Sequence, residues 1–400
     1  MYLLPKPKTI KEQDGQMLLC HSTHIVMTKE VAETEMHAAK RLQEAIRQET
    51  GLILPFSVGE VREGDLSLGI AKTLPEQTYE ITIDEKGGQI SGGDGAGVLY
   101  GVETFCQIVQ QCGGILPCVQ IQDAPDMPNR GYYFDQTRGR VLKLEELKKI
   151  ADRMCRYKLN QLQLYVEHTY LFRDFSEMWR DQTPLTAEEI RELDSYCRER
   201  HIELVPSLAS FGHLCTLLST KTYGDLCEME DSWKEPFSFW NRMRYHTINV
   251  SDERSLPLIK KMIAEYMQLF SSNKFNICAD ETFCLGKYKS KKLAEERGVH
   301  RLYIDYVKEL AQFLVENGKI PMFWGDIIWN SPELMKELPE SMICLNWGYA
   351  PEQREDETRA IAQTGAVQYL CPGVCGWNQW ANLIENSYKN ITRMCGYAAK

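Results

Sequence analysis

Two adjacent carboxylates, Asp280 and Glu281, directly follow a short apolar run at residues 274–279. The run contains Phe, Ile, Cys and Ala, and this composition predicts a buried strand. Packing gives no reason for two acids at its end, whereas strand ends carry the chemistry of α/β folds and paired carboxylates serve acid-assisted bond cleavage. The alternatives are the start of a solvated loop, or a helix N-cap with an acidic first turn. The strands and helices around Asp280 and Glu281 help to decide between a catalytic and a structural role for the pair.

Strand and helix patterns alternate from residue 130 onward, which predicts a parallel sheet. Seven apolar runs occur at residues 132–134, 162–166, 204–208, 275–279, 321–324, 342–345 and 367–370. Helical patterns separate or follow them at residues 144–157, 187–200, 256–270, 302–316, 332–338, 356–362 and 381–397. Polar or aromatic side chains follow nearly every run. We therefore predict a TIM-type (β/α)8 barrel, in which these positions meet at one mouth, rather than a doubly wound sheet.

The preceding residues, 1–124, have the pattern of a small α+β domain. Helices are expected at 37–50 and 95–109, and strands at 65–70, 79–83 and 89–91. The segment 122–128 contains two prolines and two acids, which is typical of a linker. The predicted domains are therefore residues 1–124 and a catalytic barrel at residues 125–400.

The predicted barrel has seven strands, and its last helical pattern reaches the terminus at Lys400. We therefore expect the eighth strand to be missing, which favours a fragment of a longer protein over a partner chain or a rearranged segment that covers the gap. The first and seventh strands would then have unpaired edges. Weak sugar binding and low activity are the expected consequences.

The charge and composition narrow the classes of partner. The net charge of −10 argues against nucleic acid or an anionic membrane as a partner. No stretch approaches the 18 uninterrupted apolar residues of a membrane span. Fourteen cysteines are scattered through predicted strands and helices, as expected of reduced thiols, and the prolines near Met1 interrupt any signal sequence. These features favour a cytoplasmic protein.

Several segments together resemble glycoside hydrolase family 20, the β-N-acetylhexosaminidases. The matching segments are Arg130–Asp135 with Arg138, Lys158–Asn160, Phe211–His213, Asp280–Glu281 and Phe323–Trp324. Residues 1–124 likewise resemble the small domain that precedes the catalytic barrel in this family. The segments Ser210–His213, Asp280–Gly286 and Trp347–Tyr349 are most similar to the hexosaminidase D branch.

The resemblance implies an exo-acting enzyme that removes terminal β-linked N-acetylglucosamine or N-acetylgalactosamine from a glycan or glycoconjugate. It also implies a retaining, substrate-assisted mechanism without a cofactor, in which the acetamido oxygen of the substrate is the nucleophile. Glu281 would be the general acid and later the general base. Asp280 would stay ionised, hold the acetamido N–H and stabilise the oxazolinium ion. Tyr349 resembles the tyrosine that hydrogen-bonds the acetamido oxygen.

The remaining candidate residues are expected to bind the sugar. Arg130 resembles an arginine that holds sugar hydroxyls, and a salt bridge with Asp135 is the alternative. His213 is expected to bridge a hydroxyl or to orient an acid such as Glu167, although it could be an ordinary loop histidine.

Aromatic residues complete the expected site. Trp324 and Trp377 would wall the acetamido group or stack on the sugar, with a role in the core as the alternative. Residues 214–249 form a long aromatic insertion, which predicts a lid, a binding wall, a subunit contact or a loop packed on itself. Because a subunit contact is one of these alternatives, a homo-oligomer is one of the expected states of the protein.

Two other functions agree less well with the sequence. A catalytically silent carbohydrate-binding barrel would not need the pair Asp280 and Glu281. A metal-dependent hydrolase would need clustered histidines, but the eight histidines are dispersed and only His168 and His213 fall near strand ends. We therefore expect no metal.

Overall fold

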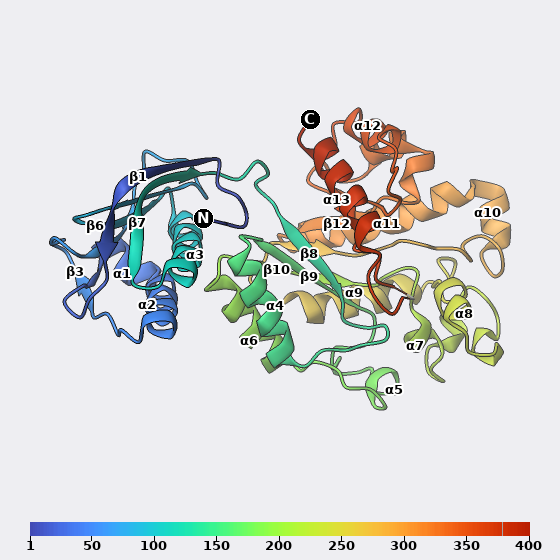
Figure 1. Cartoon of the computed structure of the whole chain (residues 1–400). Helices are drawn as coiled ribbons and strands as arrows, with labels where there is room; N and C mark the ends of the chain where they lie inside the picture. Colours follow the sequence, from blue (N-terminus) through green and yellow to red (C-terminus); the bar gives the residue numbers. More distant parts are fainter. Residues whose placement is uncertain (378) are drawn as a thin grey trace. The chain divides into compact units, whose positions relative to one another are not determined.

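The computed structural model describes residues 1–377 and 379–400, which divide into two compact units (Figure 1). Unit 1 consists of Met1–Tyr132, Glu145–Leu162 and Ser195–Glu203, and unit 2 consists of Tyr133–Leu144, Gln163–Asp194 and Leu204–Lys400. The domain boundary predicted at residue 124 stays a prediction, because unit 1 also takes in two later segments. No helix in the described ranges is long and apolar enough to cross a membrane.

Unit 1 contains a mixed sheet with the strand order β1-β7-β5-β6-β4-β2-β3. Its strands are β1 (Thr9–Leu18), β2 (Ile25–Met27), β3 (Phe56–Val58), β4 (Leu66–Ile70), β5 (Tyr79–Asp84), β6 (Gly87–Gly92) and β7 (Ile115–Asp123). The pairs from β1 to β6 are antiparallel and those from β6 to β3 are parallel. The patterns at 65–70, 79–83 and 89–91 therefore correspond to real strands, whereas β1, β2, β3 and β7 were not predicted.

Three helices accompany this sheet: α1 (Lys29–Thr34), α2 (Met36–Thr50) and α3 (Gly95–Cys112). Helix α3 buries every residue from Ala96 to Val109 and packs on β5, β6 and α2. Close approach requires glycine at position 97, since a Cβ there would lie 2.2 Å from the carbonyl oxygen of Thr78. The two helices predicted from sequence, at 37–50 and 95–109, are confirmed as α2 and α3.

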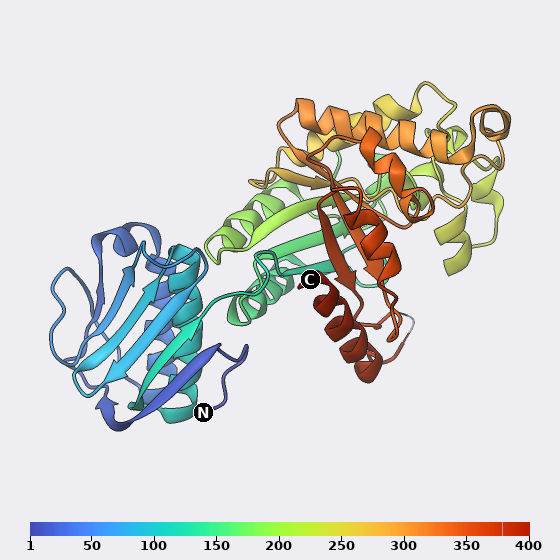
Figure 2. The same cartoon turned by 90° about the horizontal axis from the view of Figure 1, so that it is seen from above.

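The second sheet has the order β14-β13-β12-β11-β10-β9-β8 and curls like part of a barrel (Figure 2). Its strands are β8 (Gly131–Asp135), β9 (Gln161–Val166), β10 (Glu203–Leu208), β11 (Lys274–Asn276), β12 (Ile320–Trp324), β13 (Ile343–Gly348) and β14 (Gln368–Pro372). The pairs from β10 to β14 are parallel. All seven predicted strands are present, and among the described residues no eighth strand joins β8 to β14. The predicted α/β barrel architecture is confirmed.

Helices follow the strands in the predicted alternation. They are α4 (Leu144–Arg156), α6 (Ala187–Arg198), α9 (Ser255–Met267), α11 (Val299–Glu316), α12 (Asp356–Ala362) and α13 (Ile384–Ala398). The pattern at 332–338 forms a 3-10 helix, Pro332–Glu337, rather than an α-helix. Four short helices were not predicted: α5 (Ser176–Trp179), α7 (Cys215–Leu218), α8 (Phe239–Arg244) and α10 (Lys291–Arg297).

Strand β11 is shorter than its apolar run suggested. The run predicted a strand over 275–279, but β11 ends at Asn276. Cys278 and Ala279 have φ angles of 58° and 65°, which belong to the left-handed region and cannot continue an extended strand. The chain therefore turns before it reaches the two carboxylates.

Candidate active site

The carboxylates of Asp280 and Glu281 converge on one imidazole, that of His213. Nε2 of His213 lies 3.4 Å from Oδ2 of Asp280 and 3.2 Å from Oε2 of Glu281. Burial works against a charge on His213, but Asp280 and Glu281 outweigh it and raise the pKa of His213 to about 10. At neutral pH an imidazolium therefore lies between the two acids.

Asp280 is held in its ionised form by this contact. Burial favours its neutral form, yet the charge of His213 lowers the pKa of Asp280 below its usual value. Oδ1 of Asp280 is buried and has no hydrogen-bond partner among the described residues. This orphaned oxygen can accept a hydrogen bond from a ligand, since a buried carboxylate oxygen without a partner is costly.

Left-handed backbone conformations allow the two neighbouring acids to point at the same group. Consecutive residues of a strand would point to opposite faces, but Glu281 has φ 49° and follows the left-handed Cys278 and Ala279. His213 itself has φ 59°. Such conformations are rare for residues other than glycine and cluster at functional sites, where the surroundings hold them.

Hydrogen bonds from neighbouring elements hold this irregular segment. The main-chain N–H of Trp324, in β12, donates to the carbonyl oxygen of Cys278 at 2.9 Å. The hydroxyl of Tyr303, on α11, donates to the carbonyl oxygen of Ala279 at 3.0 Å. The carbonyl oxygens of Cys278 and Ala279, which are no longer part of the sheet, thus receive hydrogen bonds from the protein itself.

Gly212 brings the His213 loop against the acids. A Cβ at this position would lie 2.5 Å from the carbonyl oxygen of Asp280 and 3.2 Å from that of Glu281. We therefore expect Gly212→Ala to push the two segments apart and to lower kcat by roughly tenfold to a hundredfold, because small displacements of catalytic groups are costly. Steady-state kinetics on an N-acetylhexosaminide measure the effect. Gly396→Ala on α13, where an added Cβ meets nothing within 4 Å, is the control. Equal activity of the two variants would contradict the steric role.

Tyr349 and Trp377, two predicted site residues, lie together. The ring centroids of Tyr349 and Trp377 are 4.5 Å apart, and Trp347 stacks on Tyr349 at 4.9 Å. Burial, with a smaller contribution from the charge of Asp280, raises the pKa of Tyr349 above its usual value. The phenol is therefore a neutral hydrogen-bond donor close enough to the carboxylates to sense their charge.

Trp324 occupies a more buried position than Trp377. It is 7% exposed, whereas Trp377 is 50% exposed. The Trp324 ring meets the ring of Tyr133 edge-on, with centroids 4.9 Å apart. Trp324 is therefore a buried residue next to the irregular segment at Cys278, whereas the exposed side of Trp377 is available to a ligand.

Glu167 is held by neighbours other than His213. Its Oε1 accepts a hydrogen bond from the hydroxyl of Tyr165 at 2.9 Å, and its Oε2 pairs with Nη2 of Arg242 at 2.9 Å. Glu167 is only 3% exposed, so Arg242 supplies the positive charge that its burial requires. Glu167 still contributes to the raised pKa of His213 through its charge.

The aromatic insertion contributes to the site through Arg242. Its helix α8 also places Sδ of Met243 3.2 Å from Nη1 of Arg138. Among its aromatic residues, Trp233, Phe237, Phe239 and Trp240 are exposed. The insertion is therefore in contact with the site, and its predicted roles as lid or subunit contact stay predictions.

The sugar-binding role of Arg130 stays a prediction, and in this structure its guanidinium is bound by groups of unit 1. All three guanidinium nitrogens of Arg130 donate hydrogen bonds, to the carbonyl oxygens of Lys158, Met127 and Pro128 and to the side chains of Gln77 and Tyr100. These partners all belong to unit 1. The alternative, a salt bridge between Arg130 and Asp135, is not formed, since Asp135 pairs with Arg138.

A second arginine, Arg138, acts on the charge of the carboxylates. Oδ2 of Asp135 accepts a hydrogen bond from Nε of Arg138 at 2.6 Å, and the guanidinium lies 4.7 Å from the centre of the Tyr165 ring. Its charge also helps to lower the pKa of Asp280. A sequence signal existed, because Arg138 follows the end of β8 as the other site residues follow their strands.

Asp326 is a second residue missing from the predicted site. It lies two positions after Trp324, beyond the end of β12. Its Oδ2 accepts a hydrogen bond from the main-chain N–H of Glu281 at 3.0 Å. The sequence showed an acid after this strand but gave no means of relating it to Glu281.

His213, Asp280 and Glu281 are also the residues whose ligand atoms come closest to forming a metal site. In the described chain these atoms lie within 4.8 Å of one another. The raised pKa of His213 means that a proton occupies the imidazole at neutral pH, and a metal would have to displace it.

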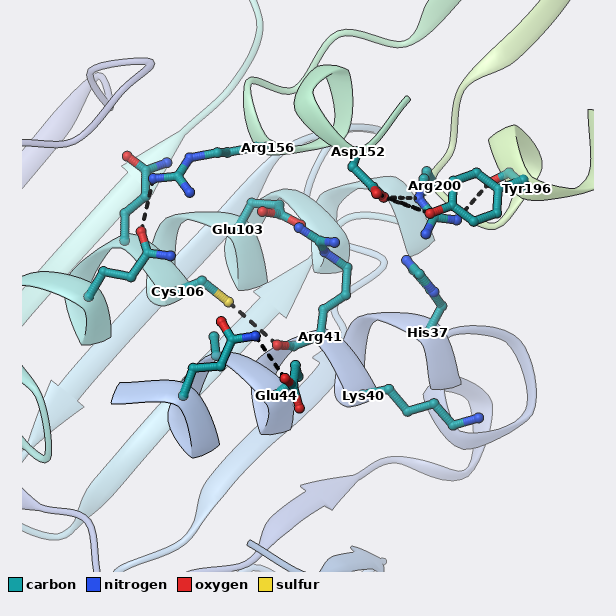
Figure 3. Close-up of a pocket in the computed structure, with 14 residues that line it drawn as sticks. His37, Lys40, Arg41, Glu44, Glu103, Cys106, Asp152, Arg156, Tyr196 and Arg200 are labelled. Carbon is teal, nitrogen blue, oxygen red and sulfur yellow. Dashed lines mark hydrogen bonds and ion pairs between the residues drawn. The ribbon is translucent and has the colours of Figure 1, made fainter. Parts of the chain in front are cut away.

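Unit 1 contains a cavity of about 440 Å³, which is a second candidate for a binding site (Figure 3). Charged side chains line it, but several are already paired within the cavity: Arg41 with Glu103, and Arg200 with Asp152. Tyr196 also donates to Asp152. These pairs satisfy one another, so the cavity lacks the unpartnered acids that distinguish the site in unit 2.

Comparisons with known proteins agree with the geometry. Residues 1–124 match domain 2 of glycosyl hydrolase family 20, and residues 128–397 match the catalytic domain of the same family. A β-hexosaminidase of Porphyromonas gingivalis is 24% identical over 411 residues, which cover 94% of this chain and 50% of that protein. A β-hexosaminidase of Vibrio furnissii is 26% identical over 310 residues, covering 70% of this chain and 48% of that protein. The chain thus spans about half the length of these two relatives.

Solved structures show the same fold. The β-N-acetylhexosaminidase of Streptomyces coelicolor superposes with a TM-score of 0.77 at 19% identity, covering 96% of this chain and 81% of that chain. A mutant β-hexosaminidase of Streptomyces plicatus in complex with its product, GlcNAc, gives a TM-score of 0.78 at 19% identity, covering 96% and 80%. With both domain models matched in order along nearly its whole length, the chain belongs to glycoside hydrolase family 20.

Proposed function

We propose that this chain is an exo-acting β-N-acetylhexosaminidase that removes terminal β-linked N-acetylglucosamine or N-acetylgalactosamine with retention of configuration. The observation that carries the proposal is the convergence of Asp280 and Glu281 on His213, with Oδ1 of Asp280 left unpartnered. Two roles follow from this arrangement, one acid to donate a proton and one carboxylate to hold the substrate.

Glu281 donates the proton to the glycosidic oxygen and later removes one from water. Asp280 accepts a hydrogen bond from the acetamido N–H through Oδ1, and its charge stabilises the oxazolinium ion formed when the acetamido oxygen attacks the anomeric carbon. Tyr349 donates its hydroxyl to the acetamido oxygen and orients it for attack. Trp377 is available to stack on the sugar, and the charge of the Arg138 guanidinium acts on Asp280.

The test is hydrolysis of a chromogenic N-acetylglucosaminide and of its galacto epimer, with the first-formed anomer observed by NMR. We expect the β-anomer and strong inhibition by an N-acetylglucosamine-thiazoline, which imitates the cyclic intermediate. An α-anomer as first product would overturn the mechanism. Binding of the thiazoline without any hydrolysis would instead support the alternative, a catalytically silent carbohydrate-binding barrel.

We further propose that the chain acts in the cytoplasm. All fourteen cysteines are free thiols, as in proteins of reducing compartments. Fractionation of the native cells, with hexosaminidase activity as the marker, tests this. The closer relationship to the hexosaminidase D branch and a homo-oligomeric state stay predictions.

A further inference from the structure

A third carboxyl group, that of Asp326, belongs to the site but has no place in the mechanism above. Its Oδ2 accepts the main-chain N–H of Glu281 at 3.0 Å, and its Oδ1 is buried without a partner among the described residues. Glu281 has φ 49°, so its N–H points away from the direction that an extended chain would give it. The side chain of Asp326 is the acceptor for this N–H, and the left-handed conformation of Glu281 depends on such support.

The groups around Asp326 are acids or neutral groups. Asp280 and Glu281 face it from the segment after β11, Tyr303 from α11 and Cys344 from β13. Burial, followed by the charges of Asp280 and Glu281, raises the pKa of Asp326 to about 8. The imidazolium of His213 is already shared by the other two acids.

We propose that Asp326 is a positioning residue, whose carboxyl oxygen accepts the main-chain N–H of Glu281 and fixes the main chain there so that the Glu281 side chain reaches the glycosidic oxygen. The positioning requires the acceptor oxygen of Asp326 and does not require a negative charge on its side chain. A third negative charge here would repel Asp280 and Glu281 in a confined space. The inference rests on the proposed function only for the part played by Glu281.

Two substitutions separate the acceptor from the charge. Asp326→Asn keeps an oxygen that can accept the N–H of Glu281 and has nearly the same shape, but it cannot ionise. Asp326→Ala removes the acceptor as well. We expect Asp326→Asn to keep kcat at pH 6 within about threefold of the wild type, and Asp326→Ala to lose roughly a hundredfold in kcat with little change in KM. Asp181→Asn, which changes an exposed carboxylate of the same unit, is the control.

The measurement is steady-state kinetics at pH 6 on a chromogenic N-acetylglucosaminide. If Asp326→Asn loses as much as Asp326→Ala, the charge is required and the proposal is wrong. Wild-type activity in Asp326→Ala overturns it as well. If Asp326→Ala fails to fold, the pH dependence of the Tm of Asp326→Asn and of the wild type, described next, still tests the proposal.

A second measurement does not depend on activity and therefore stands even if the proposed function fails. A buried acid whose pKa is raised from 3.8 to about 8 keeps its proton in the native state while the unfolded chain loses it. The wild type therefore loses stability as the pH rises from about 4 to 8, and Asp326→Asn lacks this loss. We expect the Tm of Asp326→Asn minus that of the wild type to grow over this range and to level off above pH 8. A constant difference, as expected for Asp181→Asn, would show that Asp326 is ionised throughout.

Discussion

Glu281→Gln is expected to reduce kcat about a hundredfold to ten-thousandfold on substrates with poor leaving groups, such as natural disaccharides. Gln cannot donate a proton to the departing oxygen. The loss should be much smaller on aryl glycosides whose leaving groups depart without protonation. Comparison of kcat/KM across a series of leaving groups measures the difference.

Glu340→Gln is the matched control, since Glu340 is an exposed carboxylate of the same unit. It should show wild-type values throughout the series. An equal loss by Glu281→Gln on activated and unactivated substrates would remove Glu281 from the role of general acid. The 3.2 Å contact with His213 would then be structural.

Asp280→Asn is expected to lower kcat on N-acetyl substrates about a hundredfold to a thousandfold, which is the usual cost of losing one preorganised electrostatic contact in a transition state. The amide is nearly isosteric but brings no charge to the oxazolinium ion. Near-normal turnover would show that Asp280 only caps the following segment. Circular dichroism should show an unchanged fold.

The stability of Asp280→Asn should depend on pH in a defined direction. Because the pKa of His213 is raised from 6.5 to about 10, its contact with Asp280 contributes stability fully below about pH 6.5 and loses it as the pH rises toward 10. Thermal unfolding at pH 6 and pH 10 should therefore show a larger deficit for the variant at pH 6. An equal deficit at both values would mean that His213 is neutral in the folded protein.

The sequence predicted the second sheet well because most residues of its inner strands β9, β10, β12 and β13 are buried and appear as continuous apolar runs. The same signal failed at the end of β11, where Cys278 and Ala279 are apolar but adopt left-handed conformations. Apolar composition reports burial, not backbone direction. The carboxylate pair was therefore found, but its geometry was not.

Arg130 and Arg138 illustrate a second limit. Both arginines flank β8, and spacing alone gives no reason to choose between them. The choice depends on which guanidinium is already used by carbonyl oxygens, as that of Arg130 is. Arg242 is a harder case, since it reaches Glu167 from an insertion that shows no regular pattern in the sequence.

The ion pair between Arg242 and Glu167 matters for anyone who wishes to redesign the rim of this enzyme. Loops of this length invite grafting, because a short turn could replace the α8 segment without interrupting any strand. Such a graft would leave a buried carboxylate in the scaffold without its counterion, at a cost of about 3–5 kcal/mol. Loop exchange between homologues would therefore need a paired change, with Glu167 replaced by a neutral residue whenever the donor loop brings no cation. The insertion that carries Arg242 and the strand end that carries Glu167 therefore have to be exchanged together.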